Sequence, residues 1–281
     1  MDETPFVRAA GCGETVICLH SSASSGSQWR SLMDRLSTRW RVLSPDLHGY
    51  GKSARAEGLA GLSLDDELRW LTPVFEQAGE QFHVVGHSYG GLLALLATLR
   101  LPSRVRSLVV YEPAAWSIAV DADPSHPGAR EIDGLRSGTI ELVEAGQLAA
   151  AAENFIRYWA GSRVWEAMPE DRKGTAAQAM VKVRGEFIAE ILAHDAGQST
   201  SGAFSAVAQP VLYLTGSESP LPARRVAEVL APAFVNGRRV DLAGLGHMGP
   251  VTHPDLVNRE VEAFLASRAQ TGGVSPEEAV R

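Results

Sequence analysis

Residues 86–90 read Gly-His-Ser-Tyr-Gly, a pattern that can turn a serine hydroxyl into a nucleophile. The pattern follows the apolar run 82–85 and opens a segment with helical spacing at Tyr89. At a sharp strand-to-helix turn the glycines remove side chains that would collide, and the helix N-terminus favours developing negative charge. Because strand, turn and helix are all indicated, we expect Ser88 to be a nucleophile rather than an incidental serine in a βα turn.

The chain repeats a short apolar, β-branched run followed by a loop and a segment of helical period. This alternation predicts an α/β fold whose parallel strands are covered by helices on both faces. The strands hardly alternate between apolar and polar residues, which is typical of strands buried on both sides. The runs are 15–19, 41–44, 82–85, 105–111, 211–215 and 239–242.

The rhythm of strands and helices stops between residues 117 and 207. This stretch opens with the turn-rich sequence DADPSHPGAR and continues with helical patterns over 146–159 and 170–192. We expect a core formed by 1–116 and 208–268, with 117–207 inserted as a helical lid. The polar tail 269–281 is expected to be mobile.

Composition limits the function further. The 281 residues include 26 Lys+Arg and 33 Asp+Glu, a net charge of −7 without a basic stripe, which argues against nucleic acid or an anionic membrane as partner. The N-terminus lacks a secretory pattern, and the longest apolar run is too short to span a bilayer. Cys12 and Cys18 form no disulfide framework and no zinc pattern. We expect a cytoplasmic protein without metal or cofactor that acts on a small molecule; its oligomeric state stays open.

The sequence resembles the α/β-hydrolase family from about residue 15 to residue 265. The resemblance is carried by LHSSASSGSQW after the first strand, PDLHGYGKS after the second, the turn GHSYGG, and GLGHMGPVTHP near the C-terminus. It implies an α/β-hydrolase fold: a mostly parallel central sheet flanked by helices, with a helical cap inserted after the strand that ends near Tyr111. Serine at position 88 disfavours the dehalogenases and epoxide hydrolases of this family, which place aspartate there.

The same resemblance points to His247 as the general base. In this fold the loop after the last strand brings a histidine over the nucleophile, and His247 lies in that loop. Other histidines lie within or beside other motifs, where a structural role is expected: His20, His48, His83, His87 and His253.

The acid departs from the usual pattern. Most relatives carry aspartate in a Gly-x-x-Asp turn after the penultimate strand, whereas residues 216–220 read Gly-Ser-Glu-Ser-Pro here. Some relatives place the carboxylate one strand earlier, where this chain has Glu112. A buried carboxylate at a strand end can hold the histidine tautomer and stabilise the imidazolium. We therefore favour Glu112 and keep Glu218 as the alternative.

An oxyanion hole needs two backbone N–H donors. We expect one from Tyr89, directly after the nucleophile, and one from Ser22 in the loop after His20. The family commonly has His-Gly-x in that loop, where this chain reads His-Ser-Ser. Asp46 is expected to anchor a turn by hydrogen bonds rather than to act as an acid.

Aromatic residues are the candidates for the pocket wall. Trp116 follows Glu112 by four positions, where the chain leaves the sheet, so we expect it in the substrate pocket. Phe155, Tyr158 and Trp159 share one helical face, and Trp165 follows shortly after. For each of these residues, we favour packing of the lid onto the sheet domain over a place in the pocket wall.

These observations favour a serine hydrolase that cleaves a small carboxylic ester through an acyl-enzyme on Ser88. A thioesterase, a carbon–carbon bond hydrolase and a lyase can use the same residues. A ligand-binding receptor that kept the fold is the alternative outside the enzyme class, although Ser88 and His247 argue against it.

Overall fold

The computed structural model describes residues 4–53 and 61–268; the expected mobile tail lies outside the described residues. Within these residues seven strands form one sheet in the order β1-β3-β2-β4-β5-β6-β7. All neighbouring strands are parallel except β1, which runs antiparallel to β3. The strands are β1 Val7–Ala10, β2 Thr15–Leu19, β3 Arg41–Pro45, β4 Phe82–His87, β5 Val105–Tyr111, β6 Val211–Gly216 and β7 Gly237–Leu242. The sequence pattern located all of these except β1, a four-residue strand at the sheet edge.

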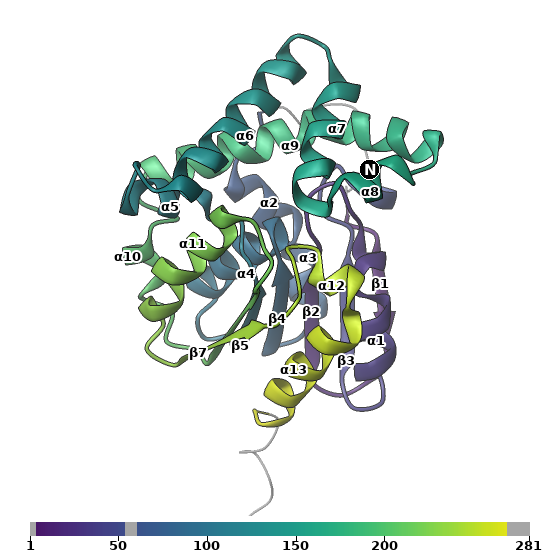
Figure 1. Cartoon of the computed structure of the whole chain (residues 1–281). Helices are drawn as coiled ribbons and strands as arrows, with labels where there is room; N and C mark the ends of the chain where they lie inside the picture. Colours follow the sequence, from purple (N-terminus) through teal and green to yellow (C-terminus); the bar gives the residue numbers. More distant parts are fainter. Residues whose placement is uncertain (1–3, 54–60, 269–281) are drawn as a thin grey trace, which may run out of the picture.

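Both faces of the sheet are covered, as Figure 1 shows. Along β2, Ile17 and Leu19 point into one apolar cluster, and Val16 and Cys18 point into another. Helices α1 (Arg30–Leu36) and α13 (Pro254–Ala266) supply the second cluster. The first cluster receives α2 (Leu64–Trp70), α3 (Thr72–Gln77), α4 (Tyr89–Arg100) and α11 (Leu221–Leu230).

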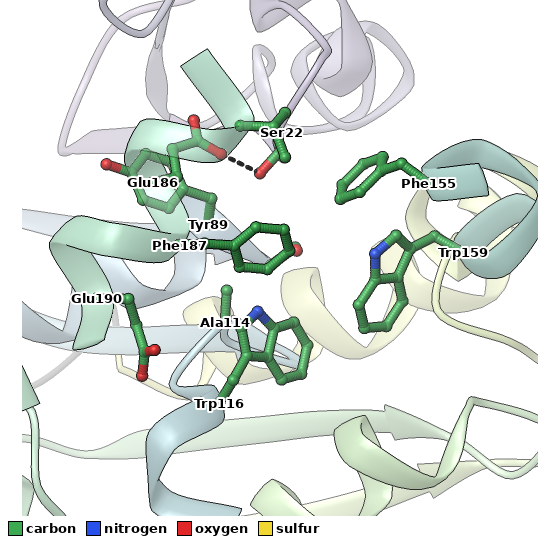
Figure 2. A pocket seen from close by; sticks show the side chains of 11 residues that line it. Ser22, Tyr89, Ala114, Trp116, Phe155, Trp159, Glu186, Phe187 and Glu190 are labelled. Carbon is green, nitrogen blue, oxygen red and sulfur yellow. Dashed lines mark hydrogen bonds between the residues drawn. The ribbon is translucent and has the colours of Figure 1, made fainter. Parts of the chain in front are cut away.

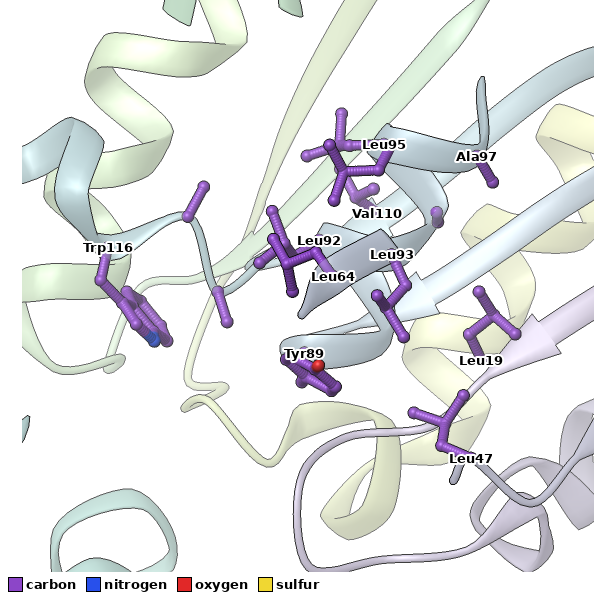
Figure 3. Close-up of a cluster of buried hydrophobic side chains, with 14 of the residues drawn as sticks. Leu19, Leu47, Leu64, Tyr89, Leu92, Leu93, Leu95, Ala97, Val110 and Trp116 are labelled. Carbon is purple, nitrogen blue, oxygen red and sulfur yellow. The ribbon is translucent and has the colours of Figure 1, made fainter. Parts of the chain in front are cut away.

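Helix α4 lies in the middle of this arrangement. Ten consecutive residues, Tyr89 to Thr98, are buried. Its leucines contact the sheet on one side and α2 on the other, where Figure 3 shows Leu92 beside Leu64. The start of α4, which carries the candidate nucleophile, therefore rests on the most completely buried helix of the core.

The chain between β5 and β6 is helical. Its helices are α5 Trp116–Ala122, α6 Pro127–Glu144, α7 Leu148–Ala160, α8 Ser162–Glu166, α9 Glu170–Asp195 and α10 Ser201–Phe204. Figure 1 shows α6, α7, α8 and α9 gathered at one end of the molecule, beyond the sheet. Helices α7 and α9 correspond to the two predicted helical patterns. The turn-rich segment is shorter than expected because α6 begins inside it, with Pro127 in its first turn and the His126 side chain accepting from the N–H of Gly128.

None of the described helices combines the length and the apolar character needed to cross a membrane.

Candidate active site

The turn between β4 and α4 places Ser88 in a conformation that few non-glycine residues adopt. Its φ of 54° and ψ of −119° lie outside the helix, and its N–H donates to the carbonyl of Tyr111 at 3.0 Å. The flanking glycines are required by close approach. A Cβ on Gly86 would lie 2.3 Å from the carbonyl oxygen of Gly90, and one on Gly90 would lie 2.4 Å from that of His20. The sequence thus forms the sharp turn that exposes a hydroxyl at the head of a helix.

The loop after β7 brings His247 to this hydroxyl. Nε2 of His247 lies 3.1 Å from Oγ of Ser88, across 159 positions of sequence. A hydrogen bond fixes this loop to the end of β4, because Nε2–H of His87 donates to the carbonyl of His247 at 2.9 Å. The indole of Trp159 covers the imidazole, with ring centroids 4.3 Å apart. His247 is therefore buried and can accept a proton from Ser88.

The other ring nitrogen of His247 contacts Glu112. Nδ1 lies 2.7 Å from Oε2 of this carboxylate, which is fully buried at the end of β5. Oε1 accepts hydrogen bonds from the hydroxyl of Thr215 at 2.8 Å, the N–H of Gly216 at 2.7 Å and the hydroxyl of Ser219 at 2.5 Å. Four partners thus hold the carboxylate in one orientation, which fixes the tautomer with its proton on Nδ1.

Glu218 does not reach this arrangement. It is exposed, and its carboxylate accepts from the hydroxyl of Ser217 at 3.3 Å. Of the two sequence candidates, the structure brings only Glu112 to His247. The loop serine next to Glu218, Ser219, contributes a hydrogen bond to the Glu112 carboxylate instead.

The two candidate oxyanion donors lie beside the nucleophile. Tyr89 is the first residue of α4, where a backbone N–H has no acceptor within the helix. Ser22, in the loop after β2, lines the same cavity as Ser88 and Tyr89. Because Gly90 has no side chain, the carbonyl of His20 approaches it closely, and the loop after β2 therefore lies directly against the turn that carries Ser88.

The walls of the cavity come from the core and from the helices between β5 and β6. Figure 2 shows the rings of Trp116, Phe187, Phe155 and Trp159 grouped together in its lining. Trp116 stacks on Trp159, with centroids 5.0 Å apart and ring planes inclined by 23°. Trp116 lines the cavity. Phe155 and Trp159 line it too, whereas the neighbouring Tyr158 donates its hydroxyl to Glu131 at 2.8 Å.

Comparison with known proteins agrees with this fold. A sequence model of the alpha/beta hydrolase fold family matches residues 14–254. The chain belongs to the alpha/beta hydrolase fold family.

Relatives of this α/β hydrolase include proteins named as esterases and hydrolases. A pimeloyl-[acyl-carrier protein] methyl ester esterase of Pectobacterium carotovorum is 27% identical over 93% of this chain and 98% of its own length. A 2-hydroxy-6-oxo-2,4-heptadienoate hydrolase of Pseudomonas putida is 30% identical over 43% of this chain and 48% of its own. The solved structure of a hydrolase from Oleispira antarctica shares the fold, with a TM-score of 0.74, 16% identity and coverage of 94% and 95%. The protein is a hydrolase.

Sequence reasoning missed the contribution of α9 to the hydrolase pocket. Glu186 and Glu190 line the cavity from this helix, and both are buried. Burial raises the pKa of both carboxyl groups, that of Glu190 to about 7. The sequence did contain a signal for this role. Glu186 and Glu190 are four positions apart, close to the apolar Val183 and Phe187, and charged residues on a buried helical face are unusual.

His20 and His83 have structural partners, as expected for them. His20 accepts from the N–H of Leu47 at 2.9 Å, and burial lowers its pKa to about 4, which keeps the ring neutral. His83 contacts the hydroxyl of Ser107 at 2.7 Å. Asp46 accepts from the N–H of Gly26 at 2.7 Å and pairs with Arg8 at 2.5 Å, which is the anchoring role predicted for it.

Proposed function

We propose that the protein is a serine hydrolase that cleaves a small carboxylic ester through an acyl-enzyme on Ser88. The observation that supports this most directly is the continuous chain of contacts from Ser88 to His247, at 3.1 Å, and from His247 to Glu112, at 2.7 Å. A hydroxyl, a base and an orienting carboxylate in this order form the arrangement that activates a serine.

The reaction follows from these positions. Oγ of Ser88 attacks the ester carbonyl carbon while its proton passes to Nε2 of His247. The carbonyl oxygen becomes an oxyanion, which the N–H groups of Tyr89 and Ser22 stabilise. The C–O bond then breaks, and the alcohol leaves with the proton from His247. A water molecule, deprotonated by His247, attacks the acyl group, and the acid leaves as Ser88 recovers its proton.

The lining of the cavity favours an apolar acyl group or alcohol. Four aromatic side chains line the cavity, Trp116, Trp159, Phe155 and Phe187, and they offer an apolar surface to the substrate. A methyl ester esterase among the relatives, similar over almost the full length of both chains, supports ester cleavage.

Carbon–carbon bond hydrolysis is the second candidate. The observation in its favour is the similarity to the heptadienoate hydrolase of Pseudomonas putida, which covers less than half of each chain. That narrower coverage is the reason for ranking it behind ester cleavage.

The test combines labelling with a substrate panel. A fluorophosphonate probe followed by peptide mass spectrometry should place the adduct on Ser88. Ser88→Ala should lose ester hydrolysis and remain folded by circular dichroism, while exchange of the exposed Ser103 for alanine should leave both unchanged. The panel contains p-nitrophenyl esters from acetyl to octanoyl, the matching thioesters and a vinylogous diketone. An adduct on another residue, accompanied by loss of activity, would refute the assignment of Ser88, and turnover of the diketone alone would favour the second candidate.

A further inference from the structure

Glu186 lies on α9, yet its carboxylate contacts two loops of the core. Oε2 accepts a hydrogen bond from the hydroxyl of Ser22 at 2.5 Å, and Oε1 accepts one from the hydroxyl of Tyr50 at 2.8 Å. Glu186 is 4% exposed, so these two hydroxyls replace the water that the carboxylate gives up. Figure 2 shows the bond to Ser22 crossing from α9 to the loop.

A second buried polar contact joins α9 to the core one turn earlier. The ammonium group of Lys182 pairs with the carboxylate of Glu67 on α2 and lies over the ring of Tyr89, 5.4 Å from the centroid. Lys182 is 2% exposed. Positions 182 and 186 share one face of the helix, so both contacts seat the same face of α9 on the core.

The loop that receives Glu186 contains a residue in a strained backbone conformation. The residue after Ser22, Ala23, adopts a positive φ of 52°, a conformation that costs free energy for a residue with a Cβ. A strained loop keeps its shape only when neighbouring groups hold it. The hydroxyl of Ser22 is bound to the buried carboxylate of Glu186 on α9. This hydrogen bond restricts the backbone of Ser22.

We infer that Glu186 is a positioning residue, which holds the backbone N–H of Ser22 in the oxyanion hole through the Ser22 hydroxyl. The oxyanion hole is then complete only while α9 is seated on the core, and α9 acts on the reaction without touching the reacting atoms. This inference rests on the proposed function, because it requires an oxyanion to form beside Ser88.

The charge of Glu186 is not what the role requires. A negative charge on Glu186 would destabilise a developing oxyanion nearby. Burial raises the pKa of Glu186, and the positive charge of Lys182 offsets part of that rise. A glutamine can accept from one hydroxyl and donate to the oxygen of the other. Glu186→Gln should therefore keep the loop in place, whereas Glu186→Ala removes both bonds.

The experiment measures kcat and KM for Ser22→Ala, Glu186→Ala, Glu186→Gln and the Ser22→Ala/Glu186→Ala double variant, with active sites counted by fluorophosphonate titration. Ser22→Ala keeps the backbone N–H and removes only the tether. Since loss of a whole oxyanion donor costs about 10²- to 10³-fold in kcat, a donor that is only misplaced should cost about 10- to 100-fold, with KM nearly unchanged. Glu186→Gln should stay within about 3-fold of the wild type. The double variant should lose no more than the worse single variant.

Two further measurements separate this role from general destabilisation. The affinity for a trifluoromethyl ketone, whose adduct with Ser88 carries an oxyanion, should fall in Ser22→Ala by the same factor as kcat/KM. Glu190→Gln provides the matched control, because Glu190 lies one turn further along α9 but bonds to Ser117. Its effect and that of Ser22→Ala should multiply, since the two sites share no partner.

The outcomes separate the positioning role of Glu186 from the serine mechanism itself. Wild-type kcat in Ser22→Ala, or losses that multiply between Ser22→Ala and Glu186→Ala, would overturn the positioning role while leaving the serine mechanism intact. Ser22→Ala carries this decision even where Glu186→Ala does not fold. A wild-type protein that neither turns over esters nor forms an adduct on Ser88 would instead overturn the proposed function, and the positioning role with it.

Discussion

The hydroxyl of Ser219 donates a hydrogen bond to Oε1 of Glu112 at 2.5 Å. Ser219 stands in the turn where most relatives carry the aspartate, and here it binds the carboxylate that comes from the neighbouring strand. Strands β5 and β6 are parallel neighbours, with Tyr111 opposite Leu214, so their carboxyl ends meet at one edge of the sheet. A carboxylate at either strand end can therefore serve the same histidine.

Glu112→Gln should lower kcat by about 10³- to 10⁴-fold, because an amide cannot hold the same histidine tautomer or stabilise the imidazolium. Glu218→Gln, in the exposed loop, should change kcat by less than about 2-fold. Steady-state kinetics and circular dichroism on both variants check this. An inactive Glu218 variant beside an active Glu112 variant would reverse the assignment of the acid.

Ser219→Ala should lower kcat by about 3- to 10-fold, because the Glu112 carboxylate loses one of its charge-assisted hydrogen bonds but keeps those from Thr215 and Gly216. Ser217→Ala is the matched control from the same turn. Ser217 is exposed, and its hydroxyl oxygen accepts from the N–H of Gly244 rather than contacting Glu112. Equal losses in both variants would show that the turn as a whole, and not the bond to Glu112, matters for the rate.

Trp116→Ala should shift preference towards bulkier acyl or alcohol groups, because it removes an indole that lines the cavity and stacks on Trp159. The ratios of kcat/KM across the ester series should change by about 10-fold or more. Trp165→Ala, which removes a buried indole outside the cavity lining, controls for loss of packing. A uniform fall in rate with a lower Tm would assign Trp116 to packing alone.

Glu190 should make stability depend on pH. Burial raises its pKa from 4.5 to about 7, so the folded state holds its proton where the unfolded chain has already released it. The stabilisation is complete below pH 4.5 and is lost as pH rises through 7, by about 3 kcal/mol in total. Glutamine at position 190 does not titrate, so Glu190→Gln does not lose this stability. In urea titrations, the unfolding free energy of Glu190→Gln minus that of the wild type should therefore increase by about 3 kcal/mol between pH 4.5 and pH 8. A difference that stays constant with pH would contradict the expectation.

The motifs of the sequence were sufficient to predict the strands and turns that carry Ser88, Glu112 and His247. Each of these residues directly follows a strand or lies in the loop after one, and a parallel sheet brings such ends to a single edge whatever the details of packing. Local sequence therefore determined which residues could meet. Strand β1 escaped prediction because four residues at a sheet edge, paired only with β3, carry little periodic signal.

The choice between Glu112 and Glu218, and the role of α9, depended on tertiary structure. Both acids follow neighbouring strands, and only the path of the loop after β6 turns the side chain of Glu218 to solvent. Glu186 lies 164 positions from Ser22, on a helix whose charged residues could equally have faced water. Which face of α9 is buried follows from how the helices between β5 and β6 pack together on the core, and that packing is a sum of many distant apolar contacts which no local pattern encodes.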